Sequence, residues 1–103
     1  MHVAFGVKSS DIEEARVWVE RATGLPAEAR ENDSMGAYYA FGELLGERLK
    51  LFDNRDPYDS EPVYRFPSWS LLVLVERTNK DSTALRGLEN DLQHFEKLET
   101  RGV

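Results

Sequence analysis

One short run of apolar residues constrains the fold more than any other feature of the chain. Residues 71–75 read Leu-Leu-Val-Leu-Val, without a polar side chain among them. A strand with one solvated face alternates between apolar and polar residues, whereas an uninterrupted apolar run is typical of a strand covered on both faces. We therefore expect a strand over residues 70–75 that lies in the middle of a sheet.

The N-terminal part of the chain predicts a strand followed by a helix. Residues 2–8 alternate in hydrophobicity, the period of a strand. Ser10 and Glu13 have the spacing of a capping box, so a helix is expected to begin there. Gly24 suits the left-handed residue that ends a helix, which places the last turn near Thr23. The apolar stripe of this helix comprises Ile12, Ala15, Val19 and Ala22.

The middle of the chain reads as sheet. A weak strand is expected over residues 27–32, followed by a turn at 32–34 and an aromatic-rich strand at 37–41. Gly42 and Gly46 flank the next turn, so residues 36–53 predict one hairpin whose second arm contains Leu49 and Leu51. Three prolines in residues 53–69 exclude a central strand there and predict a long surface loop.

The C-terminal part predicts a second helix and a further short element. Asp81 or Ser82 can cap this helix, and Gly87 should weaken its middle by about 1 kcal/mol relative to Ala. Residues 94–100 fit either a continuation of the helix or a short edge strand, and we favour the strand. The apolar stripe of the second helix is expected to comprise Leu85, Leu88 and Leu92.

These elements predict an α+β fold in one domain, residues 1–103. The order is β-α-β-β-β-β-α, with residues 94–100 as the additional C-terminal strand. A single layer of two helices packed on a mostly antiparallel sheet of about five strands accommodates that order.

Composition narrows the possible partners. The formal net charge is −6, and the chain contains no cysteine. An acidic protein repels phosphate backbones and anionic lipids, so direct binding to nucleic acid or to a membrane is not expected. A basic protein surface is a suitable partner, because complementary fields accelerate encounter. Acidity that serves only solubility is an equally good interpretation. The absence of an export signal and of a long apolar run leads us to expect a cytoplasmic protein.

The sequence contains no recognisable catalytic or metal-binding motif. The two histidines, His2 and His94, lie at opposite ends of the chain and have no neighbouring ligand pattern. No Gly-x-Ser-x-Gly elbow is present, and no glycine-rich loop precedes the first helix. We therefore expect a protein that is not an enzyme and that uses neither a metal nor a cofactor.

The loop at residues 53–69 is the candidate contact surface. It combines carboxylates, which steer a partner, with aromatic side chains of the kind enriched in binding hot spots. A structural alternative is that Tyr64, Phe66 and Trp69 fix the loop to the core while the acidic groups are only solvated. The predicted partner-binding residues are Asp53, Asp56, Tyr58, Asp59, Glu61, Tyr64 and Trp69.

Several patches along the chain resemble a group of small bacterial immunity proteins. They are Val7-Lys8-Ser9-Ser10-Asp11-Ile12-Glu13, Gly24-Leu25, Ala37-Tyr38-Tyr39, Leu49-Lys50-Leu51, and Phe66-Pro67 before Leu71 to Val75. These proteins are encoded beside polymorphic or contact-dependent growth-inhibition toxins. The resemblance implies a cytoplasmic inhibitor that binds one cognate toxin domain, often a nuclease, and covers its active cleft.

A second resemblance leads to an alternative function. His2-Val3-Ala4-Phe5, Asp11 to Ala15 and Gly24-Leu25 are similar to the opening of the glyoxalase and bleomycin-resistance family. In that family the strand histidine is a metal ligand, which implies a dimer that binds a metal or a small molecule through His2. The glutamate ligand that the family carries in a later strand is missing, because residues 49–53 offer only Lys50 and Asp53.

Overall fold

The computed structural model describes residues 1–33, 35–55, 61 and 63–102. Two helices and six strands follow one another as β-α-β-β-β-β-α-β, and the strands form one antiparallel sheet in the order β2-β3-β4-β5-β1-β6. The α+β prediction is confirmed, as is the C-terminal strand. The bounds are β1 (His2–Val7), α1 (Ile12–Thr23), β2 (Glu28–Asn32), β3 (Gly36–Gly42), β4 (Arg48–Asp53), β5 (Leu71–Glu76), α2 (Thr83–Asn90) and β6 (Phe95–Arg101).

Strand β5 occupies the middle of the sheet, as its apolar sequence predicts. It pairs with β4 on one side and with β1 on the other. Leu71, Val73 and Val75 face the helices, whereas Leu72 and Leu74 face the opposite layer. An apolar side chain is useful at each position because both faces of the strand are covered.

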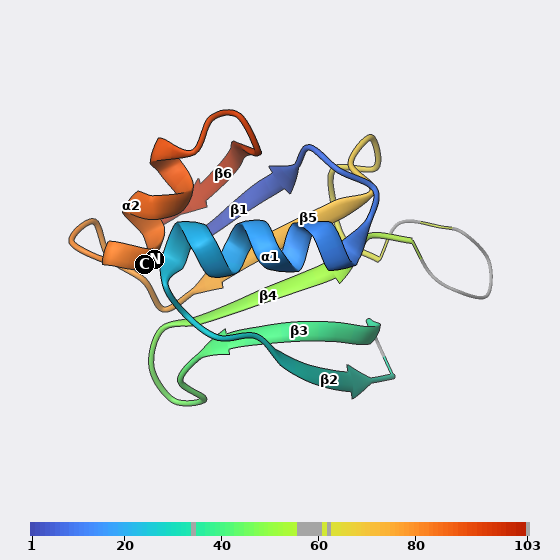
Figure 1. Cartoon of the computed structure of the whole chain (residues 1–103), viewed down its shortest axis with the longest axis horizontal. Coiled ribbons are helices and arrows are strands. Elements are labelled where there is room, and N and C mark those ends of the chain that lie inside the picture. Colours follow the sequence, from blue (N-terminus) through green and yellow to red (C-terminus); the bar gives the residue numbers. More distant parts are fainter. Residues whose placement is uncertain (34, 56–60, 62, 103) are drawn as a thin grey trace.

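Both helices cover the same face of the sheet (Figure 1). Ala15 and Val19 of α1 and Leu85 and Leu88 of α2 are buried against the inward side chains of the strands. The helices also touch each other, because Gly87 of α2 packs on the backbone of α1. The main hydrophobic core therefore lies between the sheet and one helical layer.

Helix α1 begins one residue later than the capping-box prediction, which was wrong about its cap. Asp11 is the N-cap residue, and its carboxylate accepts hydrogen bonds from the backbone N–H groups of Glu13, at 2.9 Å, and of Glu14. Ser9 accepts the N–H of Asp11 at 3.0 Å and donates to the Glu14 carboxylate at 2.8 Å. A carboxylate suits this position because the helix dipole favours negative charge at its N-terminus. Gly24 ends the helix with φ of 74°, as expected.

The expected stripe of α2 was wrong at its last position. The helix ends at Asn90, and Leu92 is 72% exposed. Asp91 is the C-cap residue, with φ of −95° and ψ of 69°, and its carboxylate contacts the His94 ring at 2.9 Å where the chain turns toward β6. Leu92 therefore lies in the turn, outside the helical stripe.

The second face of the sheet is covered only in part. Tyr64, Phe66 and Trp69, from the segment before β5, pack over one half of it together with Tyr38 and Phe52. The other half includes Lys50, Glu76 and the ends of β1 and β6, and a cavity opens over it among the described residues. A bulge in β6 places both Leu98 and Glu99 on this face.

Candidate functional site

The loop between β4 and β5 is organised by one buried side chain, Asn54, which is 1% exposed. Its amide nitrogen donates to the backbone carbonyls of Arg65, Phe66 and Trp69 at 3.2–3.3 Å. Its amide oxygen accepts from the N–H of Tyr64 at 2.8 Å. Because an asparagine amide both donates and accepts, this one residue holds the end of the loop against its beginning.

The aromatic residues of the loop are used for packing. Trp69 lies on Gly6 of β1, where a Cβ atom would come within 2.6 Å of the indole ring. The Tyr64 ring meets Phe52 edge-on, with ring centroids 6.4 Å apart. Tyr64 and Trp69 thus fix the loop to the sheet, which is the packing role that the sequence offered as an alternative to partner binding. Both are only partly buried, so their contact with a partner stays a prediction.

The acidic residues predicted from the loop are placed in part. Asp53 and Glu61 are exposed at its two sides. Asp56, Tyr58 and Asp59 lie outside the described residues.

The structure brings further carboxylates to the same end of the sheet. Glu31, near the end of β2, pairs with Ala37, and the adjoining position on β4 is Asp53. Helix α1 begins at this end too, because it follows directly on β1 (Figure 1). We call this surface the acidic end; it comprises Asp11, Glu13, Glu14, Glu31, Asp33, Asp53 and Glu61, all of them exposed.

Many cations elsewhere in the described chain already have internal partners. Arg30 pairs with Glu28, Lys50 with Glu76, and Lys97 with Glu89. Arg77 instead donates to the backbone carbonyls of Leu44 and Gly46, at 2.7 and 2.9 Å. The three ion pairs neutralise their own charges locally, whereas carbonyl partners leave the charge of Arg77 in place. At the acidic end the carboxylates outnumber the neighbouring cations, of which Arg55 is exposed beside Asp53.

A side-chain cluster fixes α1 to β3 at the border of the acidic end. Tyr39 donates a hydrogen bond to Glu13, and Arg16 contacts Glu13 at 3.1 Å. The bond from Tyr39 and the one from Arg16 lower the pKa of Glu13, and the same tyrosine bond raises the pKa of Tyr39. The ionised form of Glu13 is therefore favoured by the native structure.

Acid should remove this contribution. The pKa of Glu13 is lower in the folded than in the unfolded chain, so its stabilisation is present above the unfolded value of 4.5 and is lost as pH falls through the folded value. We expect Glu13→Gln to be less stable than wild type near neutral pH, with a difference that shrinks as the pH falls below the unfolded value of 4.5. Urea unfolding of both proteins across this range measures it, with the exposed Glu96→Gln as control. A constant difference would contradict the assignment.

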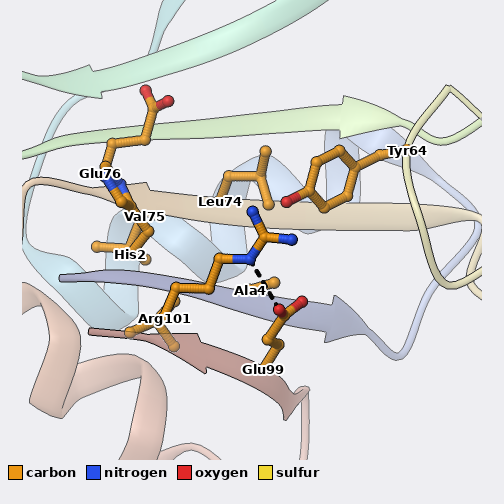
Figure 2. A pocket seen from close by; sticks show the side chains of 9 residues that line it. His2, Ala4, Tyr64, Leu74, Val75, Glu76, Glu99 and Arg101 are labelled. Atoms are coloured by element: carbon orange, nitrogen blue, oxygen red, sulfur yellow. Dashed lines mark hydrogen bonds and ion pairs between the residues drawn. The ribbon is translucent and has the colours of Figure 1, made fainter. Parts of the chain in front are cut away.

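A cavity of about 220 Å³ lies on the uncovered half of the second sheet face (Figure 2). Ala4 and Leu74 contribute apolar side chains, and Tyr64 forms one wall. Glu99 and Arg101 of β6 line the opposite side, with Arg101 Nε donating to Glu99 at 2.9 Å. His2 and Glu76 stand at the remaining rim.

The two histidines occupy different environments. His94 stacks on Trp18, with ring centroids 4.0 Å apart, and contacts Asp91. His2 is exposed at the cavity rim, and its Nδ1 accepts the backbone N–H of Arg77 at 3.4 Å. Within the described ranges, no three His, Asp or Glu side chains converge in a metal-ligating group. No helix in those ranges is long and apolar enough to cross a bilayer.

The sequence matches no protein-family model. It also matches no curated protein sequence.

Proposed function

We propose that this protein is an immunity protein that binds a cognate toxin domain, a nuclease, and covers its basic cleft with the acidic end. The observation that supports this proposal is the gathering of exposed carboxylates from α1, from the β2–β3 turn and from the loop after β4. The resemblance of short sequence patches to immunity proteins points in the same direction. The inhibitor acts in the cytoplasm, by occupying the cleft.

The physical basis is charge complementarity. A nuclease cleft must be basic because it holds the phosphate backbone of its substrate. Carboxylates at matching positions would compete with phosphate for the same cations, and their field would accelerate the encounter.

The anchoring of the loop supports tight binding. Asn54 and the packing of Trp69 on Gly6 fix the base of the loop before any partner arrives. A surface that is ordered before binding loses less conformational entropy on association than a flexible surface does. Asp53 is therefore displayed from a rigid base.

One observation favours the alternative of a glyoxalase-like half-module, namely that His2 lines the cavity on the sheet. The neighbouring carboxylates are engaged by cations: Glu76 pairs with Lys50, and Glu99 pairs with Arg65 and Arg101. A divalent cation would have to displace those side chains. Small-molecule binding suits this cavity better than metal binding.

Charge reversal tests the inhibitor proposal. The double variant Glu31→Lys/Asp53→Lys should slow association with the cognate toxin domain, sought among the genes beside this one, by about tenfold or more at low salt, and the salt dependence of the rate should flatten. Stopped-flow mixing at about 50 and 200 mM salt measures these rates. The matched control, Glu43→Lys/Asp81→Lys, alters the net charge equally through exposed acids elsewhere on the surface and should change the rate by less than about twofold.

Two results would argue against different parts of the proposal. If no toxin domain encoded beside this protein forms a complex with the wild type, or if that domain keeps its nuclease activity in the complex, the inhibitor function is wrong. If the complex inhibits the nuclease but both double variants associate at the same rate, the contact surface lies away from the acidic end.

A further inference from the structure

We infer that the cavity on the open sheet face is a binding site for a small organic carboxylate with an apolar body. This site is separate from the acidic end and does not depend on the proposed inhibitor function. The inference rests on three features of the cavity: a guanidinium group directed into it, a surplus of positive charge, and an apolar floor.

The guanidinium belongs to Arg101. Its Nε donates to Glu99 at 2.9 Å, which fixes the orientation of the group. The side chain is 57% exposed, and no hydrogen bond of its two terminal nitrogens is found in the part of the chain that the structure describes, so a ligand would replace water there. Figure 2 shows the side chain reaching from β6 across β1 toward Leu74, with Tyr64 on the far side. A planar fork with free donors suits the two oxygens of a carboxylate.

The local charge has the opposite sign to that of the whole protein. Glu99 is shared by two guanidinium groups, those of Arg65 and Arg101, so this cluster carries one net positive charge. Glu76 is neutralised by Lys50 at 3.3 Å. Arg48 lies opposite Glu76 in the pairing of β4 with β5, and its buried Nε has no hydrogen-bond partner among the described residues. A single negative charge is thus attracted into a cavity of an otherwise acidic protein.

The other side chains that line the cavity determine which chemical group the ligand carries beside its carboxylate. The Leu74 and Ala4 side chains form a floor, and the Tyr64 ring forms a wall. These surfaces favour an apolar group over a fully hydrated ion. A phosphate dianion would bring more negative charge than the one net positive charge of the cluster neutralises. A monoanionic carboxylate with a small ring or aliphatic body fits both requirements.

The test is a titration of the ¹⁵N-labelled full chain with sodium benzoate, with benzamide as its uncharged isostere and with inorganic phosphate. Benzoate should shift the amide signals of Ala4, Leu74 and Glu99 along one saturating curve, with a Kd in the range of about 0.1–10 mM. Benzamide should bind about tenfold or more weakly, because it lacks the charge that the fork recognises. Phosphate should bind more weakly than benzoate.

Variants of Arg101 distinguish the contribution of the planar guanidinium geometry from that of its positive charge. Arg101→Met, which keeps an apolar stem, should raise the Kd for benzoate about tenfold or more. Arg101→Lys retains the charge without the planar fork and should fall between wild type and Arg101→Met. The control Arg86→Met removes an exposed arginine of α2 and should bind as wild type does. Thermal unfolding of each variant shows whether it is folded.

The inference is overturned by any of four results. They are equal binding of benzoate and benzamide, tighter binding of phosphate than of benzoate, wild-type affinity in Arg101→Met, and no saturable shift at the cavity up to about 20 mM benzoate. None of these results bears on the inhibitor function, whose test uses a protein partner and a different surface.

Discussion

Replacing Asn54 with alanine is expected to lower the free energy of unfolding by about 3–5 kcal/mol, a large part of the stability of a protein of this size. The substitution removes four side-chain hydrogen bonds at a position that is 1% exposed. The carbonyls of Arg65 and Trp69 and the N–H of Tyr64 lose this partner, whereas the Phe66 carbonyl keeps the N–H of Trp69 at 3.0 Å. Polar groups left unpaired in a buried position are costly. The loop should detach from the sheet before the rest of the protein unfolds.

Two further variants test whether the lost hydrogen bonds cause the loss of stability. Asn54→Asp has nearly the same shape but loses both amide donors and directs a carboxylate oxygen at the three carbonyls, so it should be at least as damaging as the alanine variant. Asn90→Ala changes an exposed asparagine at the end of α2 and should cost less than about 1 kcal/mol. Urea unfolding measures all three. An Asn54→Ala variant within about 1 kcal/mol of wild type would show that the hydrogen bonds are not essential.

The second large effect is expected from Gly87→Ala. Intrinsic helix propensity alone predicts a gain of about 1 kcal/mol, because alanine is the better helix former. The structure predicts the opposite sign. A Cβ atom at Gly87 would lie 2.8 Å from the carbonyl carbon of Ala22 and closer still to its oxygen. Since that obstacle is backbone, α1 and α2 must separate, and overpacking of this kind costs about 1–3 kcal/mol.

Thermal and urea unfolding show whether Gly87→Ala raises or lowers the stability of the protein. Gly87→Ala should unfold at lower urea concentration, with an unchanged slope of unfolding free energy against urea. Gly102→Ala is the control, because an added Cβ at Gly102 meets no atom within 4 Å. A stabilised Gly87→Ala protein would mean that the two helices can move apart without loss of packing.

Local patterns in the sequence predict the elements well. Alternation predicts β1, and the apolar run predicts that β5 lies in the middle of the sheet. Propensity is misleading at Gly87, which it identifies as a weak point of α2 although the residue permits close packing of α2 on α1. That role depends on Ala22, which is distant in sequence, and periodicity within α2 carries no information about it.

The candidate surfaces are less predictable, since they depend on which strands become neighbours. Asp53 is identifiable from its acidic loop, whereas Glu31 joins it only through the pairing of β2, β3 and β4. The sequence signal that could have located Glu31 is its place near the end of a strand whose hairpin partner starts at Gly36. Asn54 gives no such signal, because the carbonyls that it binds belong to a segment without regular structure.

The order of the strands also determines when this protein can fold during its synthesis. Strand β1 lies between β5 and β6, both of which come from the last third of the chain. Strand β1 is synthesised before the other strands of this sheet, yet it has no hydrogen-bonding neighbour until residues 71–76 follow it. Pairing across so long a segment raises the mean sequence separation of contacts, which slows folding. The hairpin of β3 and β4 can form early, whereas the continuous sheet closes only after translation has passed β6.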